Sequence, residues 1–175
     1  FPKRLSSPDG TPASPLQNPT HTYAVGDYTA TVTASDGTQT ATDSIAILVN
    51  AVVLPAQCTS YTEINDSTRN INNADQIPLP CDDTLVEKWY RFTAPGNTTI
   101  PTSPPLMDRC QTDATGWMNF AHPAVAGETR TGNVCYHWGI DCAWSNQIDV
   151  TNCSGYYVYK LKPSPTCPLR YCTTN

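Results

Sequence analysis

The stretch CYHWGIDCAWSNQIDVTNC, residues 135–153, holds three of the eight cysteines of this chain. All eight lie between Cys58 and Cys172, and none lies among the first 57 residues. An even number of cysteines is typical of secreted domains whose small hydrophobic core is supplemented by disulfides. The distribution therefore predicts a disulfide-rich module preceded by a module of a different kind.

The cysteine spacing favours disulfides over a metal site. Zinc motifs use pairs of cysteines two to four residues apart. The closest spacings here are Cys167-x4-Cys172, at the upper limit of that range, and Cys135-x6-Cys142, outside it, so the pattern as a whole fits poorly. We therefore expect four disulfides, each stabilising the fold by about 2–4 kcal/mol, a secreted, extracellular location, and neither metal nor cofactor.

Composition narrows the class of protein further. The 175 residues allow one domain or two small ones, and 14% charged residues with 16 prolines indicate an extracellular, mostly β protein rich in loops. A net charge of −5 disfavours a nucleic-acid partner. No apolar run reaches the ~18 residues that a membrane span needs.

The first 50 residues predict an arm, residues 1–20, and a β-hairpin, residues 21–50. The arm is rich in Pro, Ser and Thr and is expected to be extended. Residues 28–35 alternate strictly between apolar and Thr or Ser side chains, and Asp36-Gly37 predicts a tight turn. A return strand is expected from about Thr38 to Val49. The apolar face of this hairpin comprises Tyr28, Val32, Ile45, Ile47 and Val49.

This region resembles the end of a PKD domain, an immunoglobulin-like sandwich. The residues that carry the resemblance are the His21-Thr-Tyr23 segment, the Gly-x-Tyr strand start and the Thr/Val strand that ends in Asp-Gly. Asp9-Gly10-Thr11 stands where that family has its Gly-Asp-Gly-Thr turn, and the preceding Trp-x-Phe-Gly of the family is absent. The resemblance covers about residues 9–50 and implies a partial sandwich.

The hairpin alone leaves Val32, Ile45 and Ile47 without cover. A sandwich needs about seven strands, and an isolated hairpin is only marginally stable in water. Three explanations remain open: the chain is a fragment of a longer protein that supplies the missing half, a neighbouring copy supplies it, or the cysteine-rich module packs against the hairpin.

Residues 51–57 are expected to be a linker, and residues 58–175 form the cysteine-rich module. This module resembles the eight-cysteine extracellular domain of the uromodulin-like family in the order, spacing and identity of its motifs. The matching motifs are Cys58-Thr-Ser-Tyr61, Cys81-Asp82, Trp89-Tyr-Arg-Phe92, Cys110-x6-Trp117, Cys135-Tyr-His-Trp138, Cys142-x-Trp144, Cys153, Gly155-Tyr-Tyr-Val-Tyr159, Pro165-x-Cys167 and Tyr171-Cys172.

The resemblance also implies a disulfide pairing, which the sequence alone cannot select from the 105 that eight cysteines allow. The implied pairs are Cys58–Cys153, Cys81–Cys167, Cys110–Cys172 and Cys135–Cys142. Peptide mapping that joined Cys58 to Cys81 would contradict this pairing.

Other candidate sites are few. Three sequons, at Asn65, Asn97 and Asn152, predict N-glycans on a secreted protein. His21, His122 and His137 lack the nucleophile and orienting group of a catalytic site, so no enzyme is predicted. The four tryptophans could form a sugar-stacking platform, but core positions are expected for them; they are Trp89, Trp117, Trp138 and Trp144.

Together these features predict a secreted glycoprotein with a structural or adhesive role. We expect a subunit of an extracellular filament or matrix, which assembles when a strand of a neighbouring copy completes the partial sandwich. The alternative is a glycan-presenting or lectin-like binding module of a larger extracellular protein.

Overall fold

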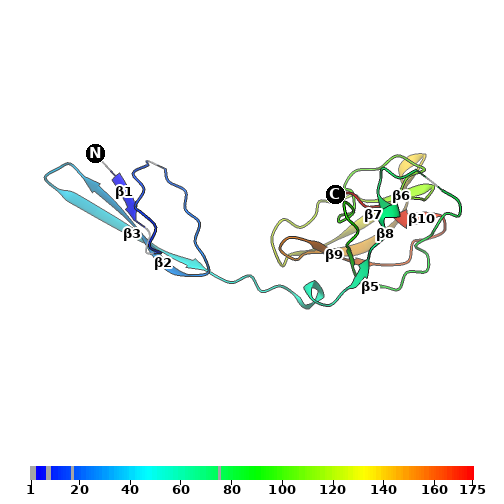
Figure 1. Ribbon diagram of the computed structural model, residues 1–175, viewed down its shortest axis with the longest axis horizontal. Helices are drawn as coiled ribbons and strands as arrows, with labels where there is room; N and C mark the ends of the chain where they lie inside the picture. Colours follow the sequence, from blue (N-terminus) through cyan, green and yellow to red (C-terminus); the bar gives the residue numbers. More distant parts are fainter. Residues whose placement is uncertain (1–2, 7–8, 17, 75) are drawn as a thin grey trace. The chain divides into compact units, whose positions relative to one another are not determined.

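The computed structural model describes residues 3–6, 9–16, 18–74 and 76–175. It consists of strands and two short 3-10 helices, which confirms the predicted mostly β, disulfide-rich fold class. The chain divides into two compact units, Phe1–Val52 and Val53–Asn175 (Figure 1). Among the described residues, no helix has both the length and the apolar character to cross a membrane.

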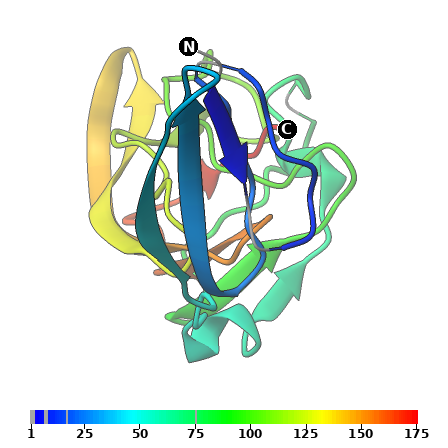
Figure 2. The ribbon, with the colours of Figure 1, turned by 90° about the vertical axis from the view of Figure 1, so that its left-hand side faces the viewer.

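The first unit is a single antiparallel sheet with the strand order β1-β2-β3 (Figure 2). Strands β2 (Gly26–Ser35) and β3 (Thr40–Val49) pair along their whole length, and β1 (Lys3–Ser6) pairs with β2. Their Thr, Val and Ile residues are those that favour strands. Because opposite residues share a face, Ala30 beside Ile45 and Tyr28 beside Ile47 bring the apolar sides of β2 and β3 together.

Part of the arm predicted for residues 1–20 is a strand instead. Within β1, Leu5 lies opposite Val32, and Leu5 also exchanges two backbone hydrogen bonds with Ser14, of 3.0 and 2.9 Å. No residue of β1 is a proline, so its backbone donors are available to pair. The prolines of the arm therefore flank the strand and do not prevent it.

The connection between β2 and β3 is longer than the predicted tight turn. Ser35 lies opposite Thr40, which leaves the four residues 36–39 in the loop. Gly37 has a φ of 96°, as expected. The Asp36 carboxylate accepts hydrogen bonds from the backbone N–H groups of Thr38 and Gln39, at 2.8 and 2.6 Å. Asp36 therefore holds the loop closed through its side chain.

The second unit is built on a seven-stranded sheet with the order β10-β6-β7-β8-β9-β5-β4. Among its described strands, the β4–β5 and β6–β10 pairs are parallel and the other pairs are antiparallel. The strands are β4 (Thr62–Ile64), β5 (Lys88–Phe92), β6 (Ala114–Met118), β7 (Thr129–Trp138), β8 (Ile140–Asn152), β9 (Tyr157–Leu161) and β10 (Leu169–Tyr171), and the 3-10 helices are η1 (Ala56–Cys58) and η2 (Ser67–Arg69).

The longest strands of this sheet, β7 and β8, form one hairpin. Gly139 alone connects them, with a φ of 70° that favours glycine. The register shifts between Tyr136 and Trp138, so the tip of the hairpin is irregular. This tip carries Trp138 and Ile140 at the surface, 46% and 65% exposed.

The main core lies against the sheet and is rich in tyrosine. Strand β5 alternates between the buried Tyr90 and Phe92 and the half-buried Trp89. Strand β9 does not alternate in this way, because Val158 packs on the Cys58–Cys153 disulfide on its other face. The main core comprises Tyr90, Phe92, Ile100, Ala114, Met118, Val134, Tyr136, Ile148, Val150, Tyr159, Leu161, Leu169 and Tyr171.

Candidate functional site

The apolar face of the first sheet is only partly covered. Ala30, near its centre, is 5% exposed, whereas Val32 is 36% and Ile45 64% exposed. The ring of Tyr23 contacts that of Tyr28, with 4.7 Å between the ring centroids, so the loop before β2 covers one end of the face. A shallow hollow of about 100 Å³ remains, lined by Leu5, Ala30, Val32, Asp43, Ser44 and Ile45.

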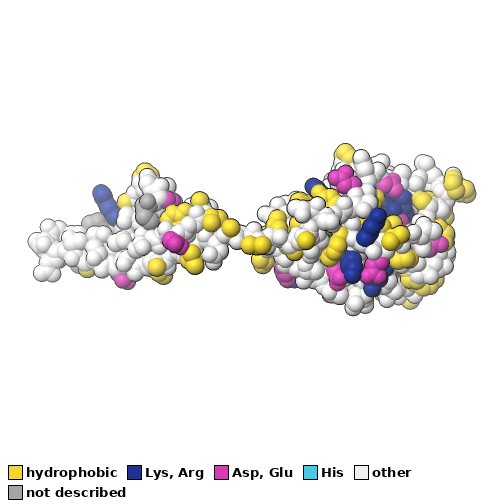
Figure 3. Space-filling model, turned by 90° about the horizontal axis from the view of Figure 1, so that it is seen from below, with side chains coloured by type: hydrophobic (Ala, Val, Ile, Leu, Met, Phe, Trp, Pro, Cys, Tyr) yellow, Lys and Arg dark blue, Asp and Glu magenta, His cyan; other side chains and the backbone are white. Residues whose placement is uncertain are grey.

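Strand β3 is an open edge of this sheet. Its ten residues pair with β2 on one side, and no described residue pairs with them on the other. Natural edge strands are usually protected by Lys, Pro or a bulge. Strand β3 has no Lys, Pro or bulge, and its single charged residue, Asp43, lies opposite Val32 on the apolar face. Figure 3 shows hydrophobic side chains at the surface of both units. The edge and the apolar face together make a surface suited to a further strand.

Four disulfides connect distant parts of the second unit. The structure joins Cys58 to Cys153, Cys81 to Cys167, Cys110 to Cys172 and Cys135 to Cys142, the same pairs that the family resemblance implies. Three of them close long segments, of 95, 86 and 62 residues. Closing long segments restricts the unfolded chain most, so these three are expected to stabilise the unit most. The fourth spans seven residues and fixes the β7–β8 hairpin.

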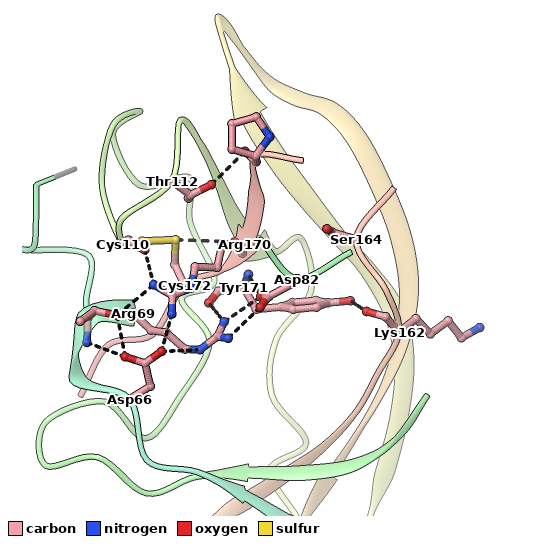
Figure 4. Close-up of polar contacts among 12 residues, drawn as sticks. Asp66, Arg69, Asp82, Cys110, Thr112, Lys162, Ser164, Arg170, Tyr171 and Cys172 are labelled. Atoms are coloured by element: carbon pink, nitrogen blue, oxygen red, sulfur yellow. Dashed lines mark hydrogen bonds and ion pairs between the residues drawn. A yellow bond between two sulfur atoms is a disulfide. The ribbon is translucent and has the colours of Figure 1, made fainter. Parts of the chain in front are cut away.

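A buried ionic network lies beside the Cys110–Cys172 bridge (Figure 4). The Arg69 guanidinium makes a bidentate contact with the Asp82 carboxylate, with both hydrogen bonds at 2.7 Å. Their side chains are 7% and 2% exposed. The same guanidinium donates to the Tyr171 carbonyl oxygen at 3.1 Å, and the Tyr171 N–H donates to Asp82 at 2.8 Å. The pair therefore fixes β10 to the segment 66–82.

A second arginine extends the network. Arg170 in β10 donates to the Asp66 carboxylate, to the Thr68 hydroxyl at 2.9 Å and to the Cys110 carbonyl oxygen at 3.0 Å. Asp66 also caps η2 by accepting from the Thr68 N–H at 3.0 Å. The four charged side chains therefore bind η2, the Cys110 loop and β10 into one rigid structure.

The charges of this network balance at neutral pH. Burial by itself would lower the pKa of Arg69, but its hydrogen bonds to Asp82 and the charge of that residue outweigh burial and raise the pKa. Burial and the nearby Arg69 lower the pKa of Arg170 to about 10, so it also stays charged. Burial would raise the pKa of Asp66, but hydrogen bonds from Thr68 and the charge of Arg170 lower it. Three of the four charged side chains thus keep their charge while buried or half-buried in the described part of the unit.

The three sequons differ in accessibility. Asn65 is exposed. Asn97 is 4% exposed, its amide nitrogen donates to the Pro95 carbonyl oxygen, and its side-chain oxygen accepts from Thr173. Asn152 ends β8 and its amide nitrogen donates to the Pro123 carbonyl oxygen. A glycan needs a free amide nitrogen at the surface, so the burial of Asn97 argues against the prediction of a glycan there and favours Asn65.

The three histidines lie in separate places. His21 contacts Asp9 at 2.6 Å, His137 contacts the Pro105 carbonyl oxygen at 2.7 Å, and His122 contacts the Tyr159 hydroxyl at 3.0 Å. Across the described part of the chain, no three His, Cys, Asp or Glu side chains gather in a way that could hold a metal ion.

His122 is expected to make stability depend on pH. Burial lowers its pKa, so the folded protein favours the neutral imidazole. The unfolded chain, with an ordinary pKa of about 6.5, takes up the proton first as the pH falls. The free energy of unfolding should therefore be fully retained above about pH 6.5 and decline below it. Urea titrations over a range from about pH 7 to 5 should show this decline, and His122→Gln should remove it. Equal pH dependence in both proteins would contradict the assignment.

The tryptophans do not all occupy the predicted core positions. Trp89 and Trp117 are half-buried, and the Trp117 indole N–H donates to the Asp141 carbonyl oxygen at 2.8 Å. Trp138 and Trp144 are 46% and 37% exposed. Both lie on the β7–β8 hairpin, Trp138 beside its Gly139 turn and Trp144 opposite the buried Tyr136. For these two residues the expected core position is wrong.

The second unit is a small β domain held by four disulfides, the class that persists in oxidising compartments. Residues 90–173 match the family model of the uromodulin-like domain with eight cysteines. The chain therefore contains a uromodulin-like domain, as the resemblance implied. The secreted, extracellular location predicted from the cysteines is confirmed with it.

Similar proteins share this region. The pancreatic secretory granule membrane major glycoprotein GP2 of mouse is 36% identical over 121 residues, which cover 66% of this chain and 23% of the mouse protein. Human GP2 is 36% identical over 118 residues, with 66% and 22% coverage. Mouse uromodulin is 33% identical over 118 residues, with 66% and 18% coverage. The chain thus matches about a fifth of the length of these relatives, none of which is named as an enzyme.

Proposed function

We propose that this protein is a structural or adhesive subunit of an extracellular assembly, without enzymatic activity. The observation that carries the proposal is the first sheet, where an open ten-residue edge borders an apolar face with Ile45 64% exposed. Adding a strand would satisfy the free backbone groups of β3, and the second sheet of a completed sandwich would cover that face. The sheet is then the last part of a PKD-like sandwich, and a neighbouring copy supplies the rest.

Mass photometry of the native material tests the proposal. We expect particles larger than one chain whose population rises with protein concentration, because strand addition is an association between copies. A monodisperse monomer with a cooperative thermal transition of both units would contradict it. If N-terminal sequencing of the native protein found further residues before Phe1, their removal by proteolysis would show whether they complete the sheet in place of a second copy.

Display of a glycan is a second proposed role, supported by the exposure of Asn65. A glycan on the surface of the uromodulin-like domain would present a ligand to other cells or microbes, and loss of such binding after enzymatic deglycosylation would support this role. Direct binding of the unglycosylated protein to a glycan array would instead indicate a lectin.

Glycan occupancy should follow accessibility. The protein is secreted from a eukaryotic host and treated with a glycosidase in heavy-oxygen water, which labels each asparagine that carried a glycan. Mass spectrometry should then find the label on Asn65 in most molecules and on Asn97 in few. The reason is the buried, doubly bonded amide of Asn97. Asn65→Gln should remove most of the glycan mass, with Asn97→Gln as the matched control. High occupancy of Asn97 would show that the glycan is attached before this loop folds.

A further inference from the structure

A pocket of about 210 Å³ opens on the second unit beside the β7–β8 hairpin. Strands β7 and β8 contribute Trp138 and Trp144 to it, and the segment before β10 contributes Cys167 and Pro168. Ala114 and Leu169 complete the apolar lining, and Thr166 adds a hydroxyl group. The lining is thus made of two indole rings, a proline, a disulfide and aliphatic carbon.

The two tryptophans are available to a ligand. Both are partly exposed, and neither indole N–H of Trp138 or Trp144 donates a hydrogen bond within the described residues, in contrast to Trp117. An aromatic ring with a free N–H combines apolar contact with one directed hydrogen bond. Grooves of this composition bind extended, proline-containing peptides, whose carbonyl groups accept from such donors. A sugar would need more polar groups than Thr166 provides.

The same chain displays a matching segment in its first unit. Residues 11–16, TPASPL, contain the exposed side chains of Pro12, Pro15 and Leu16, the last of them 65% exposed. Each proline fixes its own φ and favours an extended conformation in the residue before it. The two backbone hydrogen bonds between Ser14 and Leu5 hold the segment on β1. It is therefore presented in a fixed conformation, which reduces the entropy lost on binding.

Charged residues of opposite sign adjoin the two surfaces in the sequence. The exposed Arg4 precedes Leu5 on β1, and Leu5 pairs with Ser14 of the proline segment. On the pocket side, Asp113 immediately precedes the lining residue Ala114. Opposite charges at the rim of an interface favour the correct orientation of the partners.

We propose that the tryptophan pocket binds the Pro12–Leu16 segment of a second copy of this chain. The proposal deepens the proposed assembly function, on which it rests, by naming a second contact between copies. A contact between different surfaces of identical molecules is heterologous and builds open chains unless it closes into a ring. The contact thus gives the assembly a direction, which strand addition at β3 alone does not specify.

A peptide of residues 9–20, DGTPASPLQNPT, tests this contact. It is labelled and titrated into the full chain at low protein concentration, with fluorescence anisotropy as the readout. We expect saturable binding with a Kd on the order of 10–100 μM, typical of a small interface. Trp138→Ala and Trp144→Ala should each weaken binding by about tenfold or more. Ile140→Ala, at the same hairpin tip but outside the pocket, is the matched control and should bind normally.

Changes in the peptide make the test independent of protein folding. Replacing both Pro12 and Pro15 by alanine should weaken binding by about tenfold, because a less extended chain loses more entropy on binding. Equal affinity for a scrambled peptide, or no binding at all, would overturn the proposal. Binding of the protein to a glycan array that disappears in Trp138→Ala would also overturn the proposal. The same holds if the segment docks into the pocket of its own chain, which would protect Trp138 from solvent to the same extent at every protein concentration.

The two contacts can be separated. Ile45→Lys disrupts the strand surface in the first unit but leaves the peptide and the pocket unchanged, so it should retain peptide binding. If the unmodified protein binds the peptide but does not assemble, strand addition is refuted and the pocket contact is not. Assembly that persists in Trp138→Ala, together with no peptide binding in the unmodified chain, would refute the pocket contact alone.

Discussion

Replacing Ile45 with lysine is expected to abolish self-association of this protein. In the single chain this side chain is 64% exposed, so a lysine there should not affect folding. In the proposed assembly the same position lies under the second sheet that completes the sandwich, where an unpaired charge would lose its water. Burying such a charge costs several kcal/mol, which corresponds to a loss of affinity of about 1000-fold. Sedimentation velocity over a range of concentrations would measure the change.

Thr42→Lys is the matched control for this substitution. Thr42 lies on the same strand, opposite Thr33 in the register, and therefore on the face away from Ile45. The added charge is the same, but it stays in solvent when the second sheet covers the opposite, apolar face. Assembly should persist in Thr42→Lys. If both variants associate as the unmodified protein does, strand addition at this face is excluded.

Replacing Asp82 with asparagine should reduce the stability of the second unit more than the loss of any exposed charge. Asparagine has the same side-chain shape as aspartate and still offers an oxygen to the Tyr171 N–H. It carries no charge, however, so the Arg69 guanidinium, whose side chain is only 7% exposed, loses its buried counter-charge. Removing one partner of a buried ion pair costs about 3–5 kcal/mol. Urea unfolding followed by tryptophan fluorescence reports on this unit, since all four tryptophans lie within it.

Two further variants show whether the unpaired charge is the cause. Glu87→Gln removes the partner of Lys160 in an ion pair of 3.2 Å whose side chains are 45% and 39% exposed, and it should cost less than about 1 kcal/mol. The double variant Arg69→Met with Asp82→Asn should recover most of the stability lost in Asp82→Asn, because no charge of this pair remains buried and the Tyr171 N–H keeps its acceptor. If Asp82→Asn were as stable as Glu87→Gln, the structural role of the network would be contradicted.

The sequence predicted the strands better than it predicted the contacts between them. The period-two pattern of residues 28–35 and 45–49 identified β2 and β3, because a half-exposed sheet needs that alternation. Strand β1 was missed because four residues between prolines carry too little pattern to predict pairing. The turn type was missed because the Asp36 side chain stabilises a longer loop through hydrogen bonds that depend on its conformation.

The ionic network could not be found from sequence. Asp66 and Thr68 stand two residues apart, which is a weak sign of a helix cap, but Arg69 and Arg170 are separated by most of the cysteine-rich module. Nothing in their local sequence shows that either is buried, since arginine is ordinarily exposed. The same limit applies to Trp138 and Trp144, which the general tendency of tryptophan placed wrongly in the core.

The sequence by itself determined the class of this protein: a chain with strands at one end, eight cysteines in the rest, and the motif order of a uromodulin-like domain in a secreted location. These features are local or depend on composition, so they can be read one segment at a time. The tertiary structure decided which side chains are buried. It placed Asn97 and the Arg69–Asp82 pair inside and left Ile45, Trp138 and Trp144 at the surface. Burial depends on residues that are distant along the chain, and only their arrangement in space can set it.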